Sequence, residues 1–298
     1  MAKRVIALGF FDGVHTGHGR LLEKTVEVAG KLSLTPSVMT YSNHPSEILS
    51  PIPVGLINTT EERCALIKEL YGIDDIIVKE FTNEYASLSC ERFLEDVIIG
   101  ELSACHVVAG FDFRFGKGGS GDAEKLCSLC EKYGIGCDII GAVMCGGEAV
   151  SSSRIRECIK CGDVAEAGKL LGHYHCRISE VERGRRIGTK MGFPTVNQPM
   201  DGNICAPKSG VYATRVTVGE KCFFGVTNVG VAPTVAESGS LRAETYILGF
   251  EGDLYGEKIK VEFLSFIREE KKFGSMEELM RQIASDVEAA SAFHSTVF

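Results

Sequence analysis

The period of the apolar residues changes near residue 172, and this change limits the chain to folds that contain two different parts. Before it, short apolar runs alternate with stretches of helical spacing, as in residues 5–8 followed by 21–32. After it, stretches such as 211–218 and 258–263 alternate every second residue and are broken by glycines. The first pattern predicts an α/β domain at 1–172, and the second predicts a small antiparallel β-barrel at 173–298.

The expected elements of the first domain alternate regularly between strand and helix. A helix from 61 is marked by Thr59 and Glu62, which form a capping-box pattern, and by Gly72 at its end. Such alternation predicts a doubly wound parallel sheet, which binds ligands beyond the carboxyl ends of its strands. The expected strands are 4–8, 37–41, 76–78, 106–109 and 138–140, and the expected helices are 18–31, 61–71, 90–99, 122–133, 153–160 and 163–171. One further helix, 276–290, is expected after the barrel.

Composition narrows the class of function. The net charge of −8 argues against a general nucleic-acid binder, which needs a basic face. No apolar run approaches the length of a membrane span, and the first residues lack the pattern of a signal peptide. Twelve cysteines without a signal peptide indicate a reducing compartment and free thiols. We therefore expect a cytoplasmic protein without a nucleic-acid, membrane or obligate protein partner.

Two C-x-x-C pairs, Cys127/Cys130 and Cys158/Cys161, raise the question of a zinc site. The first pair lies in an expected amphipathic helix, where a spacing of three is ordinary for core positions. We interpret these cysteines as small core residues, with structural zinc as the alternative.

The stretch GFFDGVHTGH, residues 9–18, places His15 and His18 where the first strand turns into a helix. Helix entry exposes unpaired backbone N–H groups and the positive end of the helix dipole, so it suits an anion. Gly17 lets a phosphate approach the backbone, and both imidazoles can donate hydrogen bonds to phosphoryl oxygens. Such a site favours nucleotidyl transfer by positioning and charge stabilisation. The alternative is a pair of surface histidines.

Two other loops fit the same chemistry. Residues 110–116, GFDFRFG, follow an expected strand and project toward the same edge of the sheet. Residues 151–156, SSSRIR, open a helix with hydroxyls and two arginines, another arrangement that suits an anion. The phenylalanines could instead be core residues, and the serines an ordinary helix cap.

The second domain holds a different constellation. Gly184 and Gly188 lie in a glycine-rich loop that could wrap phosphates, and the sequence GFPTVN follows at 192–197. The Thr195 hydroxyl and the Asn197 amide oxygen suit Mg²⁺, a cation that prefers oxygen ligands. Glu244 lies in an expected strand with apolar neighbours and could act as a base. The alternatives are a hairpin with a rigid proline turn and a solvated carboxylate.

These motifs together resemble the bifunctional bacterial riboflavin kinase/FAD synthetase family, whose first domain is an HxGH nucleotidyltransferase. The resemblance runs from residue 7 to about residue 289 and includes HP at 44–45, ETY at 244–246, DLYG at 253–256 and REEKKF at 268–273. It implies ATP-dependent phosphorylation of riboflavin to FMN, then adenylylation of FMN to FAD, with Mg²⁺. The substrates implied are riboflavin, FMN and ATP.

The resemblance also implies roles for individual residues. In the adenylyltransferase, His15 and His18 are catalytic, and the residues implied to bind ATP are Gly9, Phe10, Phe11, Asp12, Gly13, His15, Gly17, His18, Ser152, Ser153 and Arg156. Those implied to bind FMN there are His44, Asp112, Phe113 and Arg114. In the kinase, Glu244 is the catalytic base, and the residues implied to bind ATP are Gly184, Gly188, Thr195, Asn197 and Tyr255. Thr195 and Asn197 hold the metal, and Arg268, Lys271 and Phe273 bind the flavin.

The chain departs from the family pattern at a few positions. Phe10 stands where the family usually carries Asn, and Thr189, Val196 and Gly249 replace the usual Arg, Ala and Asp. None of these removes a group that the chemistry needs. Two other classes remain as alternatives: a non-catalytic flavin sensor, and a nucleotidyltransferase for another small phosphate ester.

Overall fold

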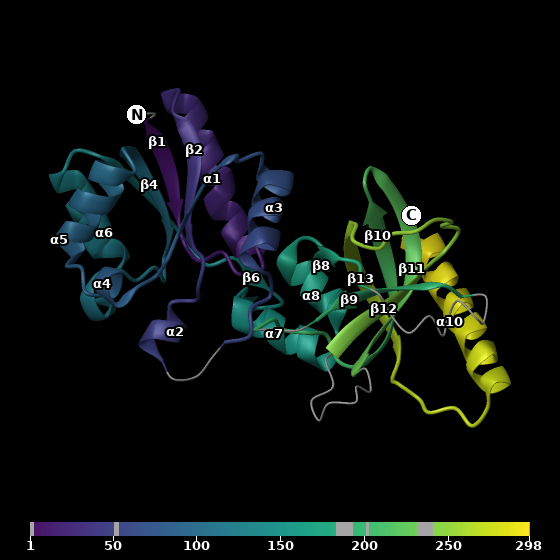
Figure 1. The fold of residues 1–298 in the computed structure, drawn as a ribbon. Helices are drawn as coiled ribbons and strands as arrows, with labels where there is room; N and C mark the ends of the chain where they lie inside the picture. Colours follow the sequence, from purple (N-terminus) through teal and green to yellow (C-terminus); the bar gives the residue numbers. More distant parts are fainter. Residues whose placement is uncertain (1–2, 51–53, 183–192, 201–202, 232–240, 298) are drawn as a thin grey trace. The chain divides into compact units, whose positions relative to one another are not determined.

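The computed structural model describes residues 3–50, 54–182, 193–200, 203–231 and 241–297. The chain forms two compact units, Met1–Ser152 and Ser153–Phe298, each built around its own sheet (Figure 1). The short helices α7 (Ser152–Cys161) and α8 (Val164–Leu171) lie in the second unit, apart from the first residue of α7. The boundary between two activities at residues 172 and 173 stays a prediction.

The first unit is built on a parallel sheet whose described strands follow the order β3-β2-β1-β4-β5. At its centre, β1 (Arg4–Leu8) pairs with β2 (Thr35–Tyr41) and β4 (Ala104–Gly110). The edges are β3 (Asp75–Lys79) and β5 (Gly136–Ile140). The predicted doubly wound sheet is confirmed, with each expected strand found within about two residues of its bounds. The carboxyl ends of β1 and β4 therefore lie side by side, where such sheets bind ligands.

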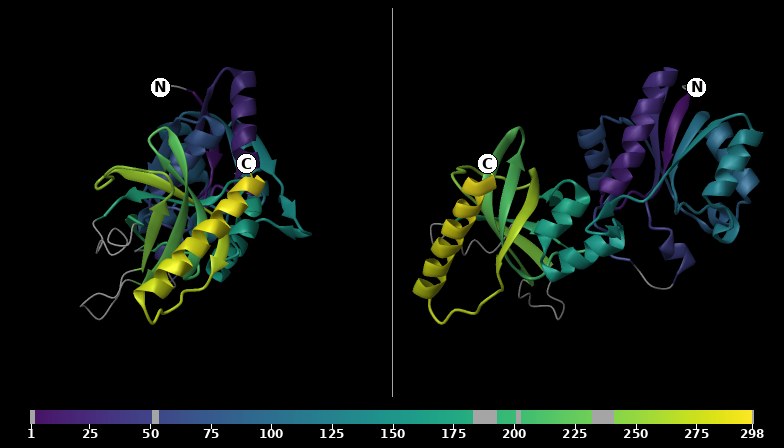
Figure 2. Two further views of the ribbon diagram at one scale, coloured as in Figure 1. Left: turned by 90° about the vertical axis from the view of Figure 1, so that its right-hand side faces the viewer. Right: turned by 180° about the vertical axis from the view of Figure 1, so that it is seen from behind.

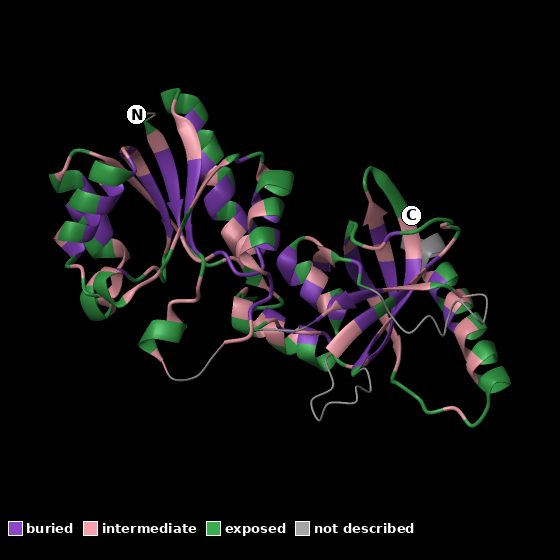
Figure 3. Cartoon of the chain, viewed as in Figure 1, coloured by how far each residue is buried: buried purple, intermediate pink, exposed green. Residues whose placement is uncertain are grey.

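Helices cover both faces of this sheet (Figures 1 and 2). On one face lie α1 (Thr16–Leu32) and α3 (Thr60–Tyr71), and on the other lie η1 (Phe93–Glu101) and α6 (Ala123–Lys132). Because both faces are covered, the central strand is apolar on both sides, and its residues 5–8 are buried (Figure 3). This explains why the strand reads as a continuous apolar run rather than an alternating one.

Local hydrogen bonds set the ends of α3 as predicted. The Thr59 hydroxyl accepts from the Glu62 N–H, the Glu62 carboxylate accepts from the Thr59 N–H, and Gly72 ends the helix with a φ of 66°.

The helix predicted at 90–99 is present, but most of it is not an α-helix. It begins as α5 (Cys90–Arg92) and continues as the π-helix η1, which is an uncommon conformation. Its apolar residues remain buried, so their spacing predicts a helix but does not reveal the wider turn. The remaining short elements of the first unit are α2 (Ser46–Leu49), α4 (Asn83–Ala86), η2 (Lys117–Gly119), β6 (Met144–Cys145) and β7 (Glu148–Ala149).

The second unit contains an antiparallel sheet that curls into the predicted barrel. Its described strands follow the order β8-β13-β10-β11-β12-β9. A bridge between Glu182, just after β8, and Asn197 on β9 joins the two ends of this order, with the Glu182 N–H donating to the Asn197 carbonyl at 2.8 Å. The strands are β8 (His175–Glu180), β9 (Thr195–Pro199), β10 (Gly210–Val218), β11 (Lys221–Val231), β12 (Leu241–Ile247) and β13 (Lys258–Arg268).

Alternate residues of β10 face opposite sides of the barrel wall. Tyr212 packs with Phe263 in one apolar cluster, whereas Val211 and Ala213 pack with Ala290 in another. Ala290 belongs to α10 (Met276–Val297), the long helix beside the sheet in Figure 1. The predicted C-terminal helix is thus confirmed, and it extends beyond its expected end at residue 290. It covers an apolar stripe that the barrel would otherwise expose to water.

Candidate active sites

The histidines of the first motif lie at the start of α1, at the carboxyl end of β1. His15 is the N-cap residue, and its Nδ1 accepts a hydrogen bond from the His18 N–H at 3.2 Å. The two rings stack at 3.6 Å between centroids, with 15° between their planes. The two imidazoles therefore lie together on one side of the helix start, as a spacing of three residues predicts.

His18 is held in its neutral form. Burial, together with the neighbouring His15 and Arg63, keeps the pKa of His18 well below its ordinary value. Within the described part of the chain, its buried Nδ1 has no hydrogen-bond partner. A neutral imidazole offers one N–H donor and one acceptor, so this ring can donate to a phosphoryl oxygen without carrying a charge.

The loop that carries the histidines is strained. Phe11 and Val14 have φ values of 60° and 44°, a left-handed conformation that costs energy for residues with a side chain. Phe11 is fully buried and meets His18 edge-on at 5.2 Å. A Cβ at Gly17 would lie 3.0 Å from the His15 ring, so a larger residue there would displace that ring. The strained residues Phe11 and Val14 thus belong to the loop that fixes the positions of the two imidazole rings.

Asp12, predicted to bind ATP, uses its carboxylate to hold a neighbouring segment. It is 2% exposed, and its Oδ1 accepts from the backbone N–H groups of Ile57 and Asn58 at 2.9 and 3.2 Å. Its backbone carbonyl accepts from the Ser152 hydroxyl at 2.9 Å, which brings the start of the SSxxIR motif to the GFFDG loop. Ser153 and Arg156 belong to the second unit, and their part in the ATP site stays a prediction.

Phe10, predicted to bind ATP, contacts His44, which is predicted to bind FMN. Its ring meets the His44 ring edge-on at 4.6 Å, and the Arg63 guanidinium lies over it at 4.2 Å from the centroid. The His44 Nδ1 lies 2.6 Å from the Ser46 hydroxyl.

Arg63 is absent from the residues that the motifs identify. The sequence does contain one signal for it. A cation in the first turn of a helix is disfavoured by the positive end of the helix dipole, so its presence there indicates a specific interaction.

The GFDFRFG loop follows β4, next to β1 in the sheet, so it starts at the same edge as the histidine loop. Phe115 is buried and packs beside Phe113, with 5.8 Å between ring centroids. Asp112 and Arg114 are exposed. The core interpretation therefore holds for two of the phenylalanines, while the charged pair remains available to a ligand.

In the second unit, the register brings the predicted kinase residues together. Glu244 on β12 lies directly opposite Asn197 on β9, and Tyr246 lies opposite Thr195. The neighbours of Glu244 in sequence, Ala243 and Thr245, are fully buried, so Glu244 lies on the outer side of the wall, where it is exposed. Directly opposite residues share one face of a sheet, which places a carboxylate beside an amide.

Thr195 and Asn197 fit a magnesium site in their donor chemistry. They lie two residues apart on β9, so they share one face, and both carry an oxygen donor of the kind that Mg²⁺ prefers. Tyr255 follows a short turn in which its N–H donates to the Asp253 carboxylate at 3.0 Å. The predicted phosphate-binding glycines Gly184 and Gly188 lie outside the described residues.

Arg268, predicted to bind the flavin, forms a two-point ion pair with Asp286. Its Nε and Nη2 donate to the two carboxylate oxygens at 2.8 and 2.7 Å, which joins β13 to α10. The Phe273 ring centroid lies 5.9 Å from the guanidinium, and Lys271 is exposed. The sequence does not reveal the Asp286 pairing, and the flavin roles of these residues stay predictions.

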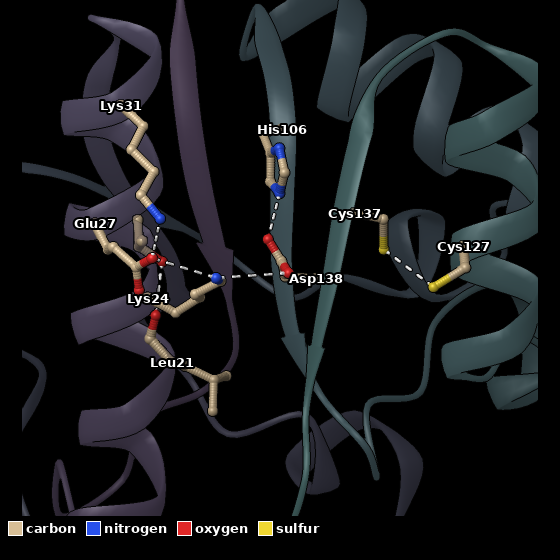
Figure 4. Close-up of polar contacts among 9 residues, drawn as sticks. Leu21, Lys24, Glu27, Lys31, His106, Cys127, Cys137 and Asp138 are labelled. Carbon is tan, nitrogen blue, oxygen red and sulfur yellow. Dashed lines mark hydrogen bonds and ion pairs between the residues drawn. The ribbon is translucent and has the colours of Figure 1, made fainter.

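The described cysteines are free thiols. Cys127 and Cys130 lie on the predicted helix, α6, and Cys130 is buried. Cys127 and Cys158 are half-buried and Cys161 is exposed, so the interpretation as core residues is right for Cys130 and wrong for Cys161. The Cys127 and Cys137 sulfur atoms are 3.3 Å apart (Figure 4). Burial raises the pKa of Cys127 to about 11, so its thiol stays protonated at neutral pH. Among the described residues, no cluster of three or more His, Cys, Asp or Glu side chains could hold a metal ion.

The same view shows a polar network between α1 and the sheet (Figure 4). Asp138 on β5 accepts from His106 on β4 at 2.8 Å and lies 3.9 Å from the Lys24 ammonium. Lys24 in turn pairs with Glu27 at 3.6 Å. These residues lie on strands and a helix rather than on the loops at the carboxyl edge, and they stabilise the packing of the unit.

The first unit has a parallel sheet with a stacked histidine pair, and the second has a barrel with a carboxylate beside oxygen donors. These features together are typical of a bifunctional transferase. The FAD synthetase family model matches residues 1–154, and the riboflavin kinase family model matches residues 171–294. The chain belongs to the bifunctional riboflavin kinase/FMN adenylyltransferase family.

Individual relatives agree with this assignment over nearly the whole chain. The bifunctional riboflavin kinase/FMN adenylyltransferase of Bacillus subtilis is 35% identical, over 99% of this chain and 94% of that protein. The protein of the same name from Listeria monocytogenes is 34% identical, over 98% of this chain and 92% of that protein.

One solved structure has the same fold throughout. It is described as a macrolide-efflux protein from Streptococcus pneumoniae, and it matches with a TM-score of 0.86 and 31% identity, over 97% of this chain and 94% of that one. Within the described residues, this chain has no helix that is both long and apolar enough to cross a membrane.

Proposed function

We propose that the chain carries out two successive ATP-dependent reactions on a flavin. The region that resembles riboflavin kinases transfers a phosphoryl group from ATP to riboflavin and forms FMN. The region that resembles FAD synthetases transfers AMP from a second ATP to FMN, forming FAD and releasing pyrophosphate. We assign the adenylyltransferase to residues 1–172 and the kinase to 173–298. The observation that carries the proposal is that each matched region contains its own set of reactive side chains.

In the adenylyltransferase, a phosphate oxygen of FMN attacks the α-phosphorus of ATP as the bond to pyrophosphate breaks. The start of α1 favours this charge through its backbone N–H groups and dipole. In its neutral form, His15 carries its ring proton on Nε2, because its Nδ1 accepts from the His18 N–H. Neutral His18 stacks on it. Both rings then act as hydrogen-bond donors to the phosphoryl oxygens as their charge increases.

In the kinase, Glu244 accepts the proton of the riboflavin 5′-hydroxyl as that oxygen attacks the γ-phosphorus. Its position opposite Asn197 brings the base next to the oxygen donors. Thr195 and Asn197 would hold Mg²⁺ together with ATP, and the cation would neutralise charge on the phosphoryl oxygens. An exposed carboxylate in this place is accessible to the hydroxyl of a substrate.

The remaining assignments follow the resemblance. Further ATP contacts in the first domain come from the residues Gly9, Phe10, Phe11, Asp12, Gly13, Gly17, Ser152, Ser153 and Arg156, and FMN contacts come from His44, Asp112, Phe113 and Arg114. In the second domain, Gly184, Gly188 and Tyr255 bind ATP, and Arg268, Lys271 and Phe273 bind the flavin. The net charge of −8 and the free thiols support a cytoplasmic enzyme of small molecules, without a nucleic-acid partner.

Incubation of the purified chain with riboflavin, ATP and Mg²⁺, followed by chromatography of FMN and FAD, tests this proposal. The double variant His15→Ala/His18→Ala should still form FMN, while FAD formation falls at least about a hundredfold, the scale expected for lost transition-state donors. FMN formation is the internal control. Persistent FAD synthesis by the double variant would refute the assignment of the loop. If the unmodified chain forms neither product, the flavin-sensor alternative gains support.

A further inference from the structure

Arg63 buries a charged side chain that is only partly hydrogen-bonded. It is 0% exposed and lies in the first turn of α3. Its Nη2 donates to the Tyr41 carbonyl at 2.5 Å and lies 3.4 Å from the Thr60 hydroxyl. Its Nε and Nη1 have no hydrogen-bond partner among the described residues. Because Nε carries one N–H group and Nη1 carries two, three of the five N–H donors of this cation are unsatisfied.

The side-chain amide of Asn58 is unsatisfied as well. Asn58 is 1% exposed, and neither polar atom of its side chain has a partner within the described parts of the chain. Asp12, whose charge acts on Arg63, already accepts two backbone N–H groups on its Oδ1, one of them from Asn58. Unpaired buried charges and amides are costly, so natural proteins retain them chiefly where they have a use.

An oxyanion satisfies such donors best. The N–H groups of a guanidinium lie in one plane and match the oxygens of a phosphate, and the bonds formed are charge-assisted. Arg63 lies where such a group arrives, since it packs on Phe10 of the histidine loop, contributes to the low pKa of His18, and donates to the carbonyl at the end of β2. Both substrates of the adenylyltransferase, ATP and FMN, carry phosphate.

Phe10 packs against this cation. Its ring lies 4.2 Å from the guanidinium and is itself only partly buried, between Arg63 and His44. It replaces the Asn that the family usually carries, and it immediately precedes Phe11, whose φ is positive. A ring in this place shields the cation from water until a ligand displaces it.

We propose that Arg63 binds a substrate phosphate in the adenylyltransferase site through its unpaired N–H groups, which become accessible when the Phe10 ring moves off the guanidinium. This inference rests on the proposed function of the first domain. It adds a phosphate-binding residue from α3 to the loops that the motifs identify, and it gives Phe10 the role of a cover.

Steady-state FAD formation from FMN and ATP by the full chain tests the proposal. Arg63→Met keeps an unbranched apolar stem but removes the cation, and it should raise the KM of one substrate by about 10–100-fold, the scale of lost charge-assisted hydrogen bonds. ATP is varied at saturating FMN, and FMN at saturating ATP, so the KM that changes identifies which phosphate binds. Arg63→Lys should restore only part of the effect, because an ammonium retains the charge without the fork.

Arg92→Met is the matched control, because the side chain of Arg92 is 66% exposed and pairs only with Asp96 among the described residues. It should leave both KM values unchanged. FMN formation from riboflavin in the same preparations checks the other activity. If Arg63→Met unfolds at the wild-type temperature with both KM values within about twofold of wild type, the proposal is wrong.

Arg63→Lys decides the matter if Arg63→Met does not fold. It should raise the KM of one substrate, by less than the loss of the whole cation would, and leave the other KM unchanged. Arg63→Lys with both KM values at the wild-type level overturns the inference. If the unmodified chain forms no FAD, it is the proposed function itself that is wrong, and not only the role of Arg63.

Discussion

Asp286→Asn should loosen the kinase unit by breaking the pair that joins β13 to α10. Asp286 is 3% exposed and accepts both Arg268 hydrogen bonds, at 2.8 and 2.7 Å, as well as one from the Gln282 amide at 3.0 Å. Asparagine keeps the size of the side chain but removes its charge and places an N–H₂ group where an acceptor is needed. The Arg268 cation then loses its counter-ion in a place where its side chain is only 16% exposed.

The size of the effect follows from this burial. Removing one partner of a buried ion pair typically costs about 3–5 kcal/mol, and the slight exposure of Arg268 favours the lower end, about 3 kcal/mol. For a unit of this size, 1 kcal/mol lowers the midpoint of thermal unfolding by about 2–4 °C. We therefore expect the kinase transition to fall by about 6–12 °C.

Scanning calorimetry of the intact chain measures this shift, and residual kinase activity after heating identifies the transition that belongs to the second unit. Glu269→Gln is the matched control, because Glu269 pairs with Lys208 at 2.7 Å but the two side chains are 70% and 41% exposed. Exposed pairs contribute less than about 1 kcal/mol, so this transition should move by no more than about 4 °C. If Asp286→Asn shifts the transition no further than Glu269→Gln does, the ion pair is not what holds α10.

Three other outcomes are expected. Burial lowers the pKa of His175 to about 3, below its value in the unfolded chain, so folding loses stability as the pH falls below about 6.5. Between pH 7 and pH 5, urea unfolding should show His175→Gln losing about 2 kcal/mol less than wild type, and equal losses would contradict this. Glu244→Gln should lower kinase kcat by about 10²–10⁴-fold with much smaller changes in KM, while FMN is still converted to FAD. A near wild-type kcat would place the base elsewhere. Metal analysis of protein purified without chelator should find no stoichiometric zinc, because the described residues contain no cluster of three or more side chains that could ligate it. About one zinc per chain would reverse this interpretation.

The sequence by itself determined the features that depend on neighbours along the chain. Apolar runs and glycines predicted the parallel strands, and Thr59 and Glu62 predicted the start of α3, because a capping box is closed by residues three apart. The spacing of His15 and His18 predicted that their side chains point to the same side of the helix, and the structure shows that the rings stack. Parallel strands then placed the loops after β1 and β4 at one edge of the sheet.

Only the tertiary structure decided which distant groups become partners. In the sequence Arg63 is marked only as a cation in the first turn of a helix, and it is packing against Phe10 and the end of β2 that buries it completely. Arg268 reads as a flavin ligand by its motif, yet Asp286 lies 18 residues away and meets it because α10 packs on the barrel. Periodicity shows which side of an element is apolar, but the partner of a buried charge depends on which surfaces come together when the chain folds.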